Sequence, residues 1–321
     1  MTAAANTVGP SRPTLLNLPP SMRILSWNCR GAGRPEFLTA ARDLIHRTTP
    51  EIFIVLDTRM HEERAHPLIQ RLPFTDCIVL SALGFAGGIW VLWNAAVTTV
   101  RQMRLGPRTT HLEVEHKTGE DPFILSAVYN HPQPNLQHQV WDELNSISDL
   151  INNHKWLLIG DFNCILHPHE KIGGNFYPTR ILRFSECMNY CNLLDLGYIG
   201  HKFTWTNRQF GKSFICERLD RALANVYWCN AFPKPLLLTL VLAFQTIHPF
   251  YLTLAQTRLI ELYYTNLLDM RLVGLFMRIS FILWLMLGNL KCLICWILDL
   301  GLVILILLLR LLDGKNIVLV T

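Results

Sequence analysis

Charged side chains are scarce in this chain. Asp, Glu, Lys and Arg make up 17% of its 321 residues, whereas 50% are hydrophobic. This composition excludes a chain that is disordered or fibrous throughout. The net charge of +5 is also small, so it permits a polyanionic partner without requiring one. No internal repeat is visible, and the length suits two ordinary domains or one large α/β domain with a tail.

The beginning of the sequence lacks the pattern of a secretory signal. Residues 1–20 contain no apolar core behind basic residues. The nine cysteines are an odd number and are scattered, so we expect reduced thiols inside the cell. Cys292 and Cys295 are spaced like half of a zinc site, but no two further ligands stand nearby, so we expect no zinc there.

Composition divides the chain into three parts. Residues 1–21 are small, polar and proline-rich, which predicts a disordered leader. Residues 22–230 alternate β-rich apolar runs with helical patterns, as a layered α/β domain does. The expected strands are 23–27, 52–56, 78–81, 88–93, 123–129 and 156–160, and the expected helices are 36–48, 135–153 and 180–191.

The third part, residues 231–321, is a leucine-rich tail with few acidic residues. Residues 279–290 and 300–309 carry no charge, but a membrane-spanning length of about 18–20 residues must include Lys291 or Asp299. Each charge costs roughly 2.5–3.5 kcal/mol at the bilayer centre, against gains of about 0.3–0.6 kcal/mol per Leu, Ile, Phe or Val. Insertion is therefore energetically allowed, and a membrane anchor stays an alternative.

Three polar residues stand where expected strands end. The amide of Asn28 can orient a carboxylate or donate to a phosphate oxygen, or it simply forms a turn. Asp57 follows the apolar run 52–56, where a carboxylate can ligate a hard cation such as Mg²⁺ or cap the next helix. Tyr129 can bind phosphate or lie at the edge of the core.

The most specific short signal is Ile-Gly-Asp-Phe-Asn at residues 159–163. Asp161 and Asn163 follow a buried strand and, two residues apart, point to the same side. An acid and an amide in that arrangement can align a water nucleophile and a phosphate. We therefore take both as candidate catalytic residues.

Two later motifs add candidates for substrate binding. Trp205, with Asn207 two residues on, offers an aromatic face for a base or sugar. Arg218 and Asp220 lie in Glu-Arg-Leu-Asp-Arg, where Asp220 can hold a histidine in one tautomer or pair with Arg218 or Arg221. We name Trp205, Asn207 and Arg218 as candidate substrate-binding residues.

In this order, the motifs resemble the endonuclease/exonuclease/phosphatase superfamily, and in particular the endonuclease domain of plant LINE-type non-LTR retrotransposons. The resemblance covers about residues 22–230. It is carried by MRILSWNCRG at 22–31, GFAGGIWVLWN at 84–94, LLIGDFNCIL at 157–166, HEKIGG at 169–174, LLDLGYIGHKFTWTN at 193–207 and ICERLDRALAN at 215–225.

The resemblance implies a four-layered αββα sandwich, in which two mixed β-sheets pack face to face with helices outside. It also implies hydrolysis of a DNA phosphodiester with Mg²⁺ (or Mn²⁺), leaving a 3′-hydroxyl that can prime reverse transcription. In this reading Asn28 assists the metal, and Asp57 stands where the family usually has a metal-binding Glu. A divalent ion would offset the charge of the transition state.

The resemblance also assigns four catalytic roles. Tyr129 would contact the scissile phosphate, and Asn163 would contact phosphate beside it. Asp161 would orient or deprotonate the attacking water. Asp220 would support a catalytic histidine. DNA is then the expected partner and the nucleus the expected location; we expect no obligate protein partner and no membrane association.

This chain departs from the family pattern at two places. Asp57 is one methylene shorter than Glu, which draws its oxygens back by roughly 1 Å from a cation that needs ligands at about 2.0–2.1 Å. The family also ends with Ser-Asp-His on a last core strand, but no Ser-Asp-His follows Asp220, and the only histidine there is His248. We find no catalytic histidine and expect the last core strand to be missing, which predicts weak or no nuclease activity.

A slipped reading frame is our hypothesis for this loss. With suitable third bases, the codons for Phe244 to Ile247 regroup to Ser-Asp-His, and the flanking codons permit Pro-Arg-Leu before it and Pro-Pro-Leu-Leu after it. The slip would lie near residues 232–236, in a decayed element or through a gene-prediction error, and would make the tail non-native. Coding DNA without Ser-Asp-His in another frame over codons 235–252 would disprove this.

Two alternative functions remain open from the sequence. One is a phosphoesterase of the same superfamily that acts on phosphoinositides or nucleotides. The other is a non-catalytic membrane-associated protein anchored by residues 279–309.

Overall fold

A computed structural model describes residues 22–239, except 85, 118, 120 and 234, together with residues 250–253. These residues fall within a compact unit, Ser21–Gln256. Within this described part, no helix is both long and apolar enough to cross a bilayer. The leader, the hydrophobic segment 279–309 and His248 lie outside the described residues, so the expectations about them stay predictions.

The first sheet has seven strands and contains both parallel and antiparallel pairs. β1 (Arg23–Asn28) pairs with β2 (Ile52–Leu56) in parallel, and β2 pairs with β4 (Ile89–Trp93) antiparallel. In spatial order, the strands are β11 (Ile199–Gly200), β15 (Leu236–Thr239), β16 (Phe250–Thr253), β1 (Arg23–Asn28), β2 (Ile52–Leu56), β4 (Ile89–Trp93) and β3 (Asp76–Leu80).

The second sheet has six strands and is also mixed. In spatial order, they are β10 (Leu193–Asp195), β14 (Asp220–Asn225), β8 (Trp156–Asp161), β7 (Phe123–Tyr129), β6 (Thr109–His116) and β5 (Thr98–Leu105). A third, small sheet contains β12 (Trp205–Thr206), β13 (Cys216–Glu217) and β9 (Lys171–Ile172).

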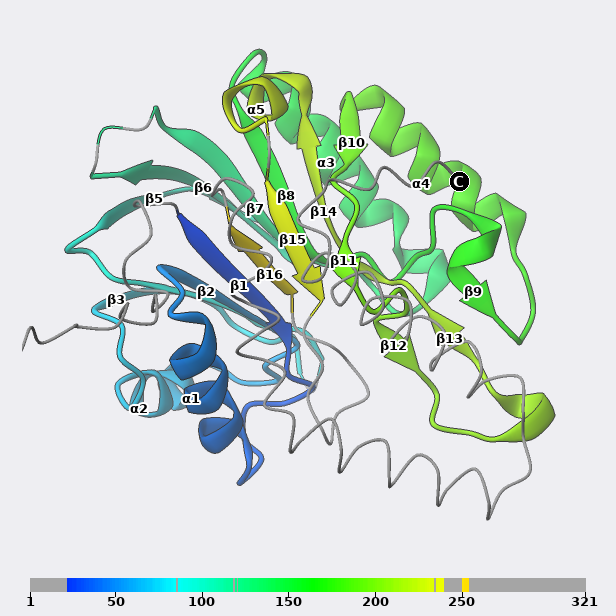
Figure 1. Ribbon diagram of the computed structural model, residues 1–321, viewed down its shortest axis with the longest axis horizontal. Helices are drawn as coiled ribbons and strands as arrows, with labels where there is room; N and C mark the ends of the chain where they lie inside the picture. Colours follow the sequence, from blue (N-terminus) through cyan, green and yellow to red (C-terminus); the bar gives the residue numbers. More distant parts are fainter. Residues whose placement is uncertain are drawn as a thin grey trace, which may run out of the picture. The chain divides into compact units, whose positions relative to one another are not determined.

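The two large sheets pack face to face on a shared apolar core (Figure 1). Side chains of the first sheet, such as Ile24 and Ile54, and of the second, such as Leu125 and Ile159, belong to one buried cluster. Because side chains alternate across a strand, the neighbours of these residues face outward. Trp27 on β1 thus stacks on Phe37 of a helix, with ring centroids 5.4 Å apart.

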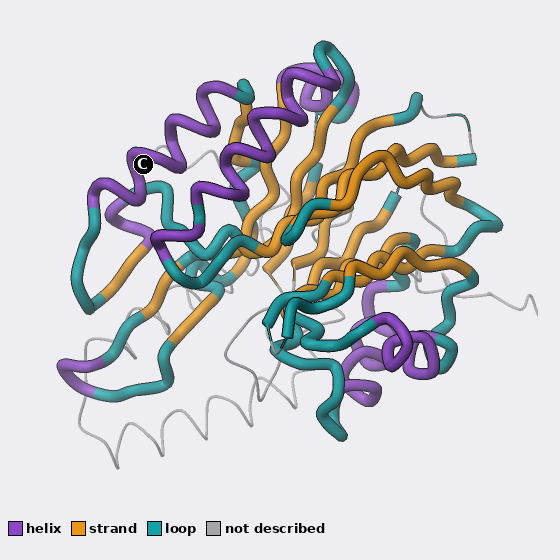
Figure 2. Tube along the Cα trace, turned by 180° about the vertical axis from the view of Figure 1, so that it is seen from behind, coloured by secondary structure: helices purple, strands orange, loops and turns teal. Residues whose placement is uncertain are grey.

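Helices form the two outer layers, as Figure 2 shows from behind. α3 (His138–Ile151) packs an apolar face that includes Leu144 and Ile147 against the second sheet, in a cluster with Trp156 and Phe184. The helices are α1 (Phe37–Thr48), α2 (Glu62–Ile69), α3 (His138–Ile151), α4 (Pro178–Tyr190) and α5 (Val226–Ala231), with 3₁₀ turns η2 (Pro134–Leu136), η3 (Pro168–Glu170) and η4 (Gly211–Ser213).

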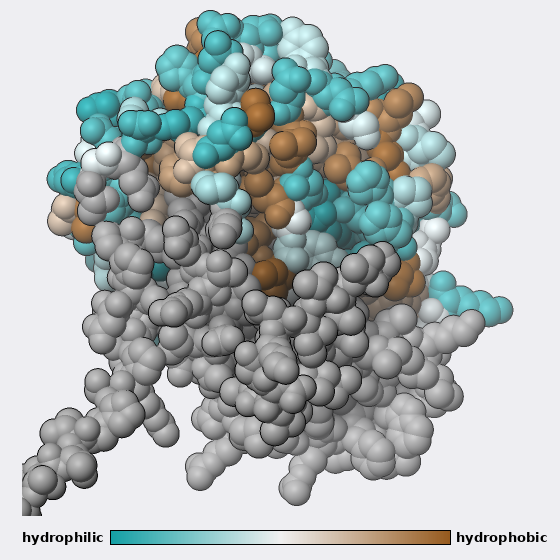
Figure 3. Space-filling view, turned by 45° about the horizontal axis from the view of Figure 1, so that its top comes forward, coloured by the Kyte–Doolittle hydropathy of each residue, from teal (hydrophilic) through white to brown (hydrophobic). Residues whose placement is uncertain are grey.

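The surface is mixed in character. In Figure 3, hydrophilic and apolar side chains lie interspersed over the described part of one face. The large exposed apolar residues include Leu83, Leu150 and Phe210. Exposed apolar side chains that are scattered in this way are normal for folded proteins and identify no site by themselves.

The predicted αββα sandwich is confirmed, but the expectation of a missing last strand is wrong. β16 pairs antiparallel with β1, with Ser26 opposite Phe250, and β15 pairs with β16 in turn. The physical reason is that β1 would otherwise present an unpaired row of backbone groups. The sequence Phe-Tyr-Leu-Thr of β16 suits a strand and fills that edge.

Candidate active site

Strand ends from both sheets meet at one place. On the second sheet, Asp161 at the end of β8 lies opposite Tyr129 of β7 and Asp220 of β14 in the ladders. On the first sheet, β1 ends at Asn28, whose Nδ2 donates to Oδ2 of Asp161 over 2.7 Å. Both side chains are buried. The two sheets are therefore joined by a direct amide–carboxylate hydrogen bond at Asp161, one of the predicted catalytic residues.

Asp161 is held by its own loop as well. Its Oδ1 accepts the backbone N–H of Asn163 over 2.8 Å, and the Asn163 side chain donates to the carbonyl oxygen of Asn130. Gly160 allows β8 to approach β7 here, because an added Cβ would lie 2.0 Å from the carbonyl oxygen of Val128. The backbone of Asn163 is thus held against the Asp161 carboxylate, while the Asn163 side chain binds Asn130.

Asp220 lies beside Asp161, and one carboxylate oxygen of Asp220 lacks a hydrogen-bond partner among the described residues. The backbone N–H of Asp220 donates to Oγ1 of Thr204 over 3.0 Å, which anchors the strand start. Its Oδ2 is buried and makes no hydrogen bond within the described part of the chain. A buried unsatisfied carboxylate oxygen is costly, and such atoms gather at functional sites.

Burial shifts the proton affinities of this pair. Burial raises the pKa of Asp161 to about 6, although the Asn163 N–H, the Asn28 amide and the nearby Arg30 act in the opposite direction. Burial, followed by the charge of Asp161, raises the pKa of Asp220 well above its ordinary value. Two buried carboxylates that resist ionisation together form a place where a cation would be favoured.

Asp57 and Tyr129 complete the acidic cluster. Asp57 is buried; its Oδ1 accepts the Gly87 N–H over 3.2 Å, and its Oδ2 accepts two hydrogen bonds from the Arg59 guanidinium. Burial, and then the nearby carboxylates of Asp57 and Asp161, raise the pKa of Tyr129 above its ordinary value. Tyr129 therefore stays a neutral hydroxyl that can donate a hydrogen bond to a phosphate oxygen.

Backbone strain gathers around the same cluster. Arg30, Asp57, Arg59 and Asn163 all have φ between 48° and 54°, a left-handed conformation that non-glycine residues seldom adopt. Each such residue costs energy and persists only where the surrounding structure holds it. Asp57 directly follows β2, and Arg30 and Asn163 lie two residues after the ends of β1 and β8. The strain therefore marks the strand ends as a candidate functional site.

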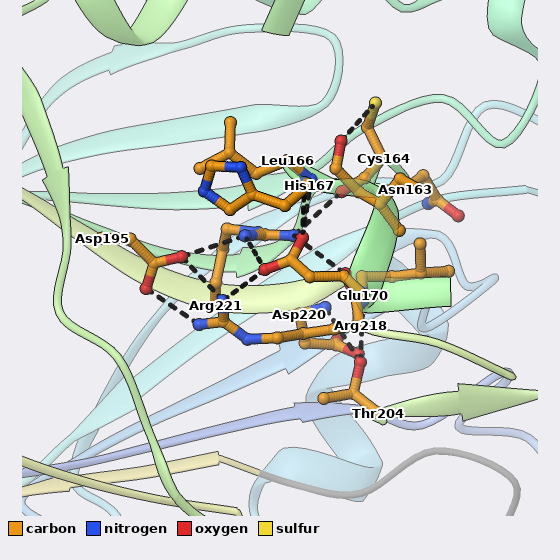
Figure 4. Close-up of polar contacts among 12 residues, drawn as sticks. Asn163, Cys164, Leu166, His167, Glu170, Asp195, Thr204, Arg218, Asp220 and Arg221 are labelled. Atoms are coloured by element: carbon orange, nitrogen blue, oxygen red, sulfur yellow. Dashed lines mark hydrogen bonds and ion pairs between the residues drawn. The ribbon is translucent and has the colours of Figure 1, made fainter. Parts of the chain in front are cut away.

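A second buried cluster lies next to the first, and it is fully ionic (Figure 4). Glu170 accepts hydrogen bonds from the guanidinium groups of Arg218 and Arg221, over 2.7 and 3.0 Å. Asp195 accepts from the same two arginines, over 2.8 to 2.9 Å. We call these four residues the Glu170 network. It ties the loop after Asp161 to the strand that carries Asp220.

The Glu170 network corrects the expected role of Arg218. We expected this arginine to bind substrate, but it is 5% exposed and its two terminal nitrogens are paired within the network. Asn207 is likewise used internally, since its side chain donates to Ser213 and accepts the N–H groups of Gln209 and Ile215. Its amide shapes the turn between β12 and β13.

The other expected site residues lie as follows. Asn28, Asp57, Asp161, Asn163, Asp220 and Tyr129 are brought together, whereas Trp205 lies half-buried on β12 beyond Thr204. Two residues at the site, Thr204 and Arg30, were not predicted from the sequence. Thr204 directly precedes Trp205, but its role depends on a hydrogen bond to the Asp220 backbone, which the sequence alone does not reveal. Arg30 lies within the quoted Trp-Asn-Cys-Arg-Gly, which was the available signal.

The chemistry of the donor set fits a hard divalent cation. Among the described residues, no three His, Cys, Asp or Glu side chains gather closely enough to form a metal site by themselves. Mg²⁺ keeps several of its waters, however, and commonly takes one or two carboxylates. The unpartnered oxygen of Asp220, the carboxylate of Asp161 and the Asn28 amide supply hard oxygen ligands, and Asp57 adds negative charge nearby.

The sequence pattern that defines the Endonuclease/Exonuclease/phosphatase family matches residues 25–241, about two thirds of the chain. A search of curated proteins finds no match.

Several solved structures share the fold. The AP endonuclease LMAP from Leishmania major is 13% identical, with a TM-score of 0.58 over 77% of this chain and 92% of that one. The endonuclease domain of TRAS1, a telomere-specific non-LTR retrotransposon, is 11% identical, with a TM-score of 0.54 over 73% and 98%. The 3′ phosphatase NExo from Neisseria, bound to a product DNA hairpin, is 14% identical, with a TM-score of 0.54 over 72% and 98%.

Proposed function

Because this chain belongs to the endonuclease/exonuclease/phosphatase family, we propose that it is a phosphodiesterase domain that nicks DNA with a divalent metal ion. The observation that carries the proposal is the Asn28–Asp161 hydrogen bond between the two sheets, with Asp220 buried beside it and one of its oxygens unpartnered. The family is generally dependent on divalent metals, and Mg²⁺ (or Mn²⁺) is the ion we propose.

Each residue of the cluster has a chemical task in this proposal. Asn28, Asp161 and Asp220 would supply oxygen ligands to the ion, and Asp57 would add negative charge nearby. The bound ion would supply a positive charge against the phosphate. Asp161, whose pKa is about 6, accepts the proton of the attacking water near neutral pH. Asn163 and the neutral Tyr129 donate hydrogen bonds to phosphate oxygens, which orients the phosphate for attack.

We propose that the nick is the one that starts insertion of a LINE-type retroelement. The motifs quoted above support this assignment, and the TRAS1 retrotransposon domain is among the structures with this fold. A plant origin and a nuclear location belong to the same proposal. Activity on small phosphoesters instead of DNA would favour the phosphoinositide or nucleotide alternative.

We further propose that the activity is weak. No histidine side chain pairs with Asp220 among the described residues, and the chain lacks the Ser-Asp-His sequence. A positioned acid or base contributes roughly 10²–10⁴-fold to a rate. The expected phenotype is therefore slow, metal-dependent nicking rather than efficient cleavage.

A plasmid-nicking assay with Mg²⁺ tests the proposal. We expect slow conversion of supercoiled to open-circular DNA that stops with chelator and in Asp161→Asn. Asp142→Asn on the exposed face of α3 is the matched control and should leave the rate unchanged. Nicking that survives Asp161→Asn would contradict the proposed site, and rapid nicking by the native chain would contradict the claim of weak activity.

A gain-of-function variant tests the reason for the weak activity. The double substitution Thr246→Ser and Ile247→Asp creates Ser-Asp-His directly before the Pro249 that precedes β16. We expect nicking to rise, by up to roughly 10²–10⁴-fold if the restored group is well placed. His248→Ala should reverse the gain and should leave the native chain's slow rate unchanged; a native rate that falls in His248→Ala would show that His248 already acts.

A further inference from the structure

Arg108 stands beside the proposed catalytic cluster, although no sequence motif pointed to it. It directly precedes β6, and its carbonyl oxygen accepts the backbone N–H of Tyr129 over 3.0 Å. Its guanidinium lies over the Tyr129 ring, with Cζ 5.4 Å from the ring centroid. This stacking fixes the guanidinium next to the tyrosine that we propose touches phosphate.

The guanidinium of Arg108 is buried but poorly satisfied. Arg108 is 9% exposed, and its Nη1 has no hydrogen-bond partner within the described part of the chain. Burial lowers the pKa of this arginine, while the nearby Tyr129 and Asp57 raise it. A buried charged donor without a partner is costly, so its persistence calls for an anion that arrives from outside.

Asp57, the carboxylate whose charge raises the pKa of Arg108, does not satisfy this arginine. Asp57 is already engaged by Arg59 and by the Gly87 N–H. Gly87 lies beside the guanidinium: a Cβ added at Gly87 would make ordinary contacts with Nη1 of Arg108, at 3.6 Å, and with the Tyr129 ring, at 3.9 Å. The edge of Arg108 is therefore bordered by glycine backbone and an aromatic ring, and neither of these supplies an acceptor side chain.

We propose that Arg108 binds a second backbone phosphate of a polynucleotide, next to the phosphate that is cut. The proposal rests on the proposed function and deepens it. Tyr129 faces Asp161 in the β7–β8 ladder and stacks on Arg108, so it lies between the two. A phosphate at Arg108 is thus distinct from one at Asp161. A substrate that occupies both phosphate positions must contain adjacent phosphodiesters. DNA contains them, whereas a mononucleotide does not.

DNA binding without catalysis tests this proposal. A fluorescein-labelled DNA duplex is titrated with the full chain in chelator, over a range of salt concentrations, and anisotropy gives the Kd. We expect Arg108→Met to weaken binding by roughly 10-fold or more and to lower the salt slope by about one counterion. The matched control is Arg101→Met, an exposed β5 arginine paired with Glu113, which should retain the native Kd and slope.

A second probe separates the proposal from a folding defect and from the proposed function. A duplex with one neutral methylphosphonate beside the nick site should bind the native chain more weakly, and Arg108→Met should bind it no more weakly than unmodified DNA. Arg108→Lys should keep part of the affinity. Equal Kd and salt slope for Arg108→Met and native protein would overturn the proposal. Native DNA binding without nicking would instead contradict the proposed function alone.

Discussion

Two buried acidic clusters lie side by side in this protein and behave in opposite ways. In the Glu170 network, two carboxylates face two guanidinium groups, and the pKa of Glu170 falls to about 2. At Asp161 and Asp220, two carboxylates share little positive charge, and both pKa values are raised. Burial alone raises the pKa of a carboxyl in either place, so the partners decide the difference.

The difference separates a structural role from a functional one. Arg218, Asp220 and Arg221 are almost consecutive, yet the two arginines hold the fold while Asp220 faces the site. In the Glu170 network each carboxylate is paired with an arginine, so the network needs no ligand to balance its charge. At Asp161 and Asp220 the backbone nearby is strained and the negative charge is only partly balanced, so a bound cation would be favoured. Carboxylates with raised pKa values and no partner therefore indicate a functional site.

The largest contrast is expected when one partner of the Glu170 network is removed. Glu170→Gln should destabilise the protein by about 3–5 kcal/mol, because Arg218 and Arg221 lose a buried counter-charge. Urea unfolding followed by circular dichroism measures this. The exposed pair of Arg101 and Glu113 is the control, since Glu113→Gln should cost at most about 1 kcal/mol. Equal costs at the two sites would contradict the assigned role of the network.

The pH dependence of stability should report the same network. Burial would raise the pKa of Glu170, but the charge and hydrogen bonds of Arg221, with those of Leu166 N–H and Arg218, lower it from 4.5 to about 2. The folded state therefore binds this proton less well than the unfolded state. Its contribution, roughly 3 kcal/mol, is present above about pH 5 and is lost as the pH falls to about 2.

Urea midpoints of the native chain and Glu170→Gln between pH 2 and 7 measure this contribution. The difference between the two should be largest near neutral pH and should shrink on acidification. A difference that is independent of pH would show that Glu170 does not carry the acid sensitivity.

The smallest expected effect has the opposite sign. Asp220→Asn replaces a carboxyl whose ionisation is opposed by burial and by Asp161, and which has one oxygen unpaired among the described residues. We expect stability to stay level or to rise by about 0.5–2 kcal/mol, as at other sites where function opposes stability. The same urea titration at pH 7 measures it, and a loss of more than about 2 kcal/mol would place Asp220 among the structural residues.

Much of the core could be predicted from apolar runs. Residues 52–56 and 123–129 are apolar runs with nearly no polar interruption, and the structure begins and ends β2 and β7 at these residues. β6 was missed because its buried face includes Thr109 and His111, whose hydrogen bonds to each other and to Ser126 satisfy polar groups inside the sheet. The two-residue strands β9, β12 and β13 are too short to show a period.

The site was predictable where strand ends carry polar residues, as at Asn28 and Asp161. Its partners were not, because ion pairing depends on the tertiary fold. His167 and His169 are exposed, for example, but Glu170 in the same loop is buried between two arginines. Arg218 was wrongly expected to bind substrate for the same reason. The sequence around Arg218 does not show that Asp195 and Glu170 pair with it in the fold.

Equilibrium binding of Mn²⁺, followed by electron paramagnetic resonance, tests the central claim most directly, because it needs no catalysis. The account predicts one Mn²⁺ per chain that Mg²⁺ displaces, with binding weakened at least about tenfold in Asp161→Asn and unchanged in Asp142→Asn. Absence of stoichiometric binding, or equal affinity in Asp161→Asn and the native chain, would contradict it.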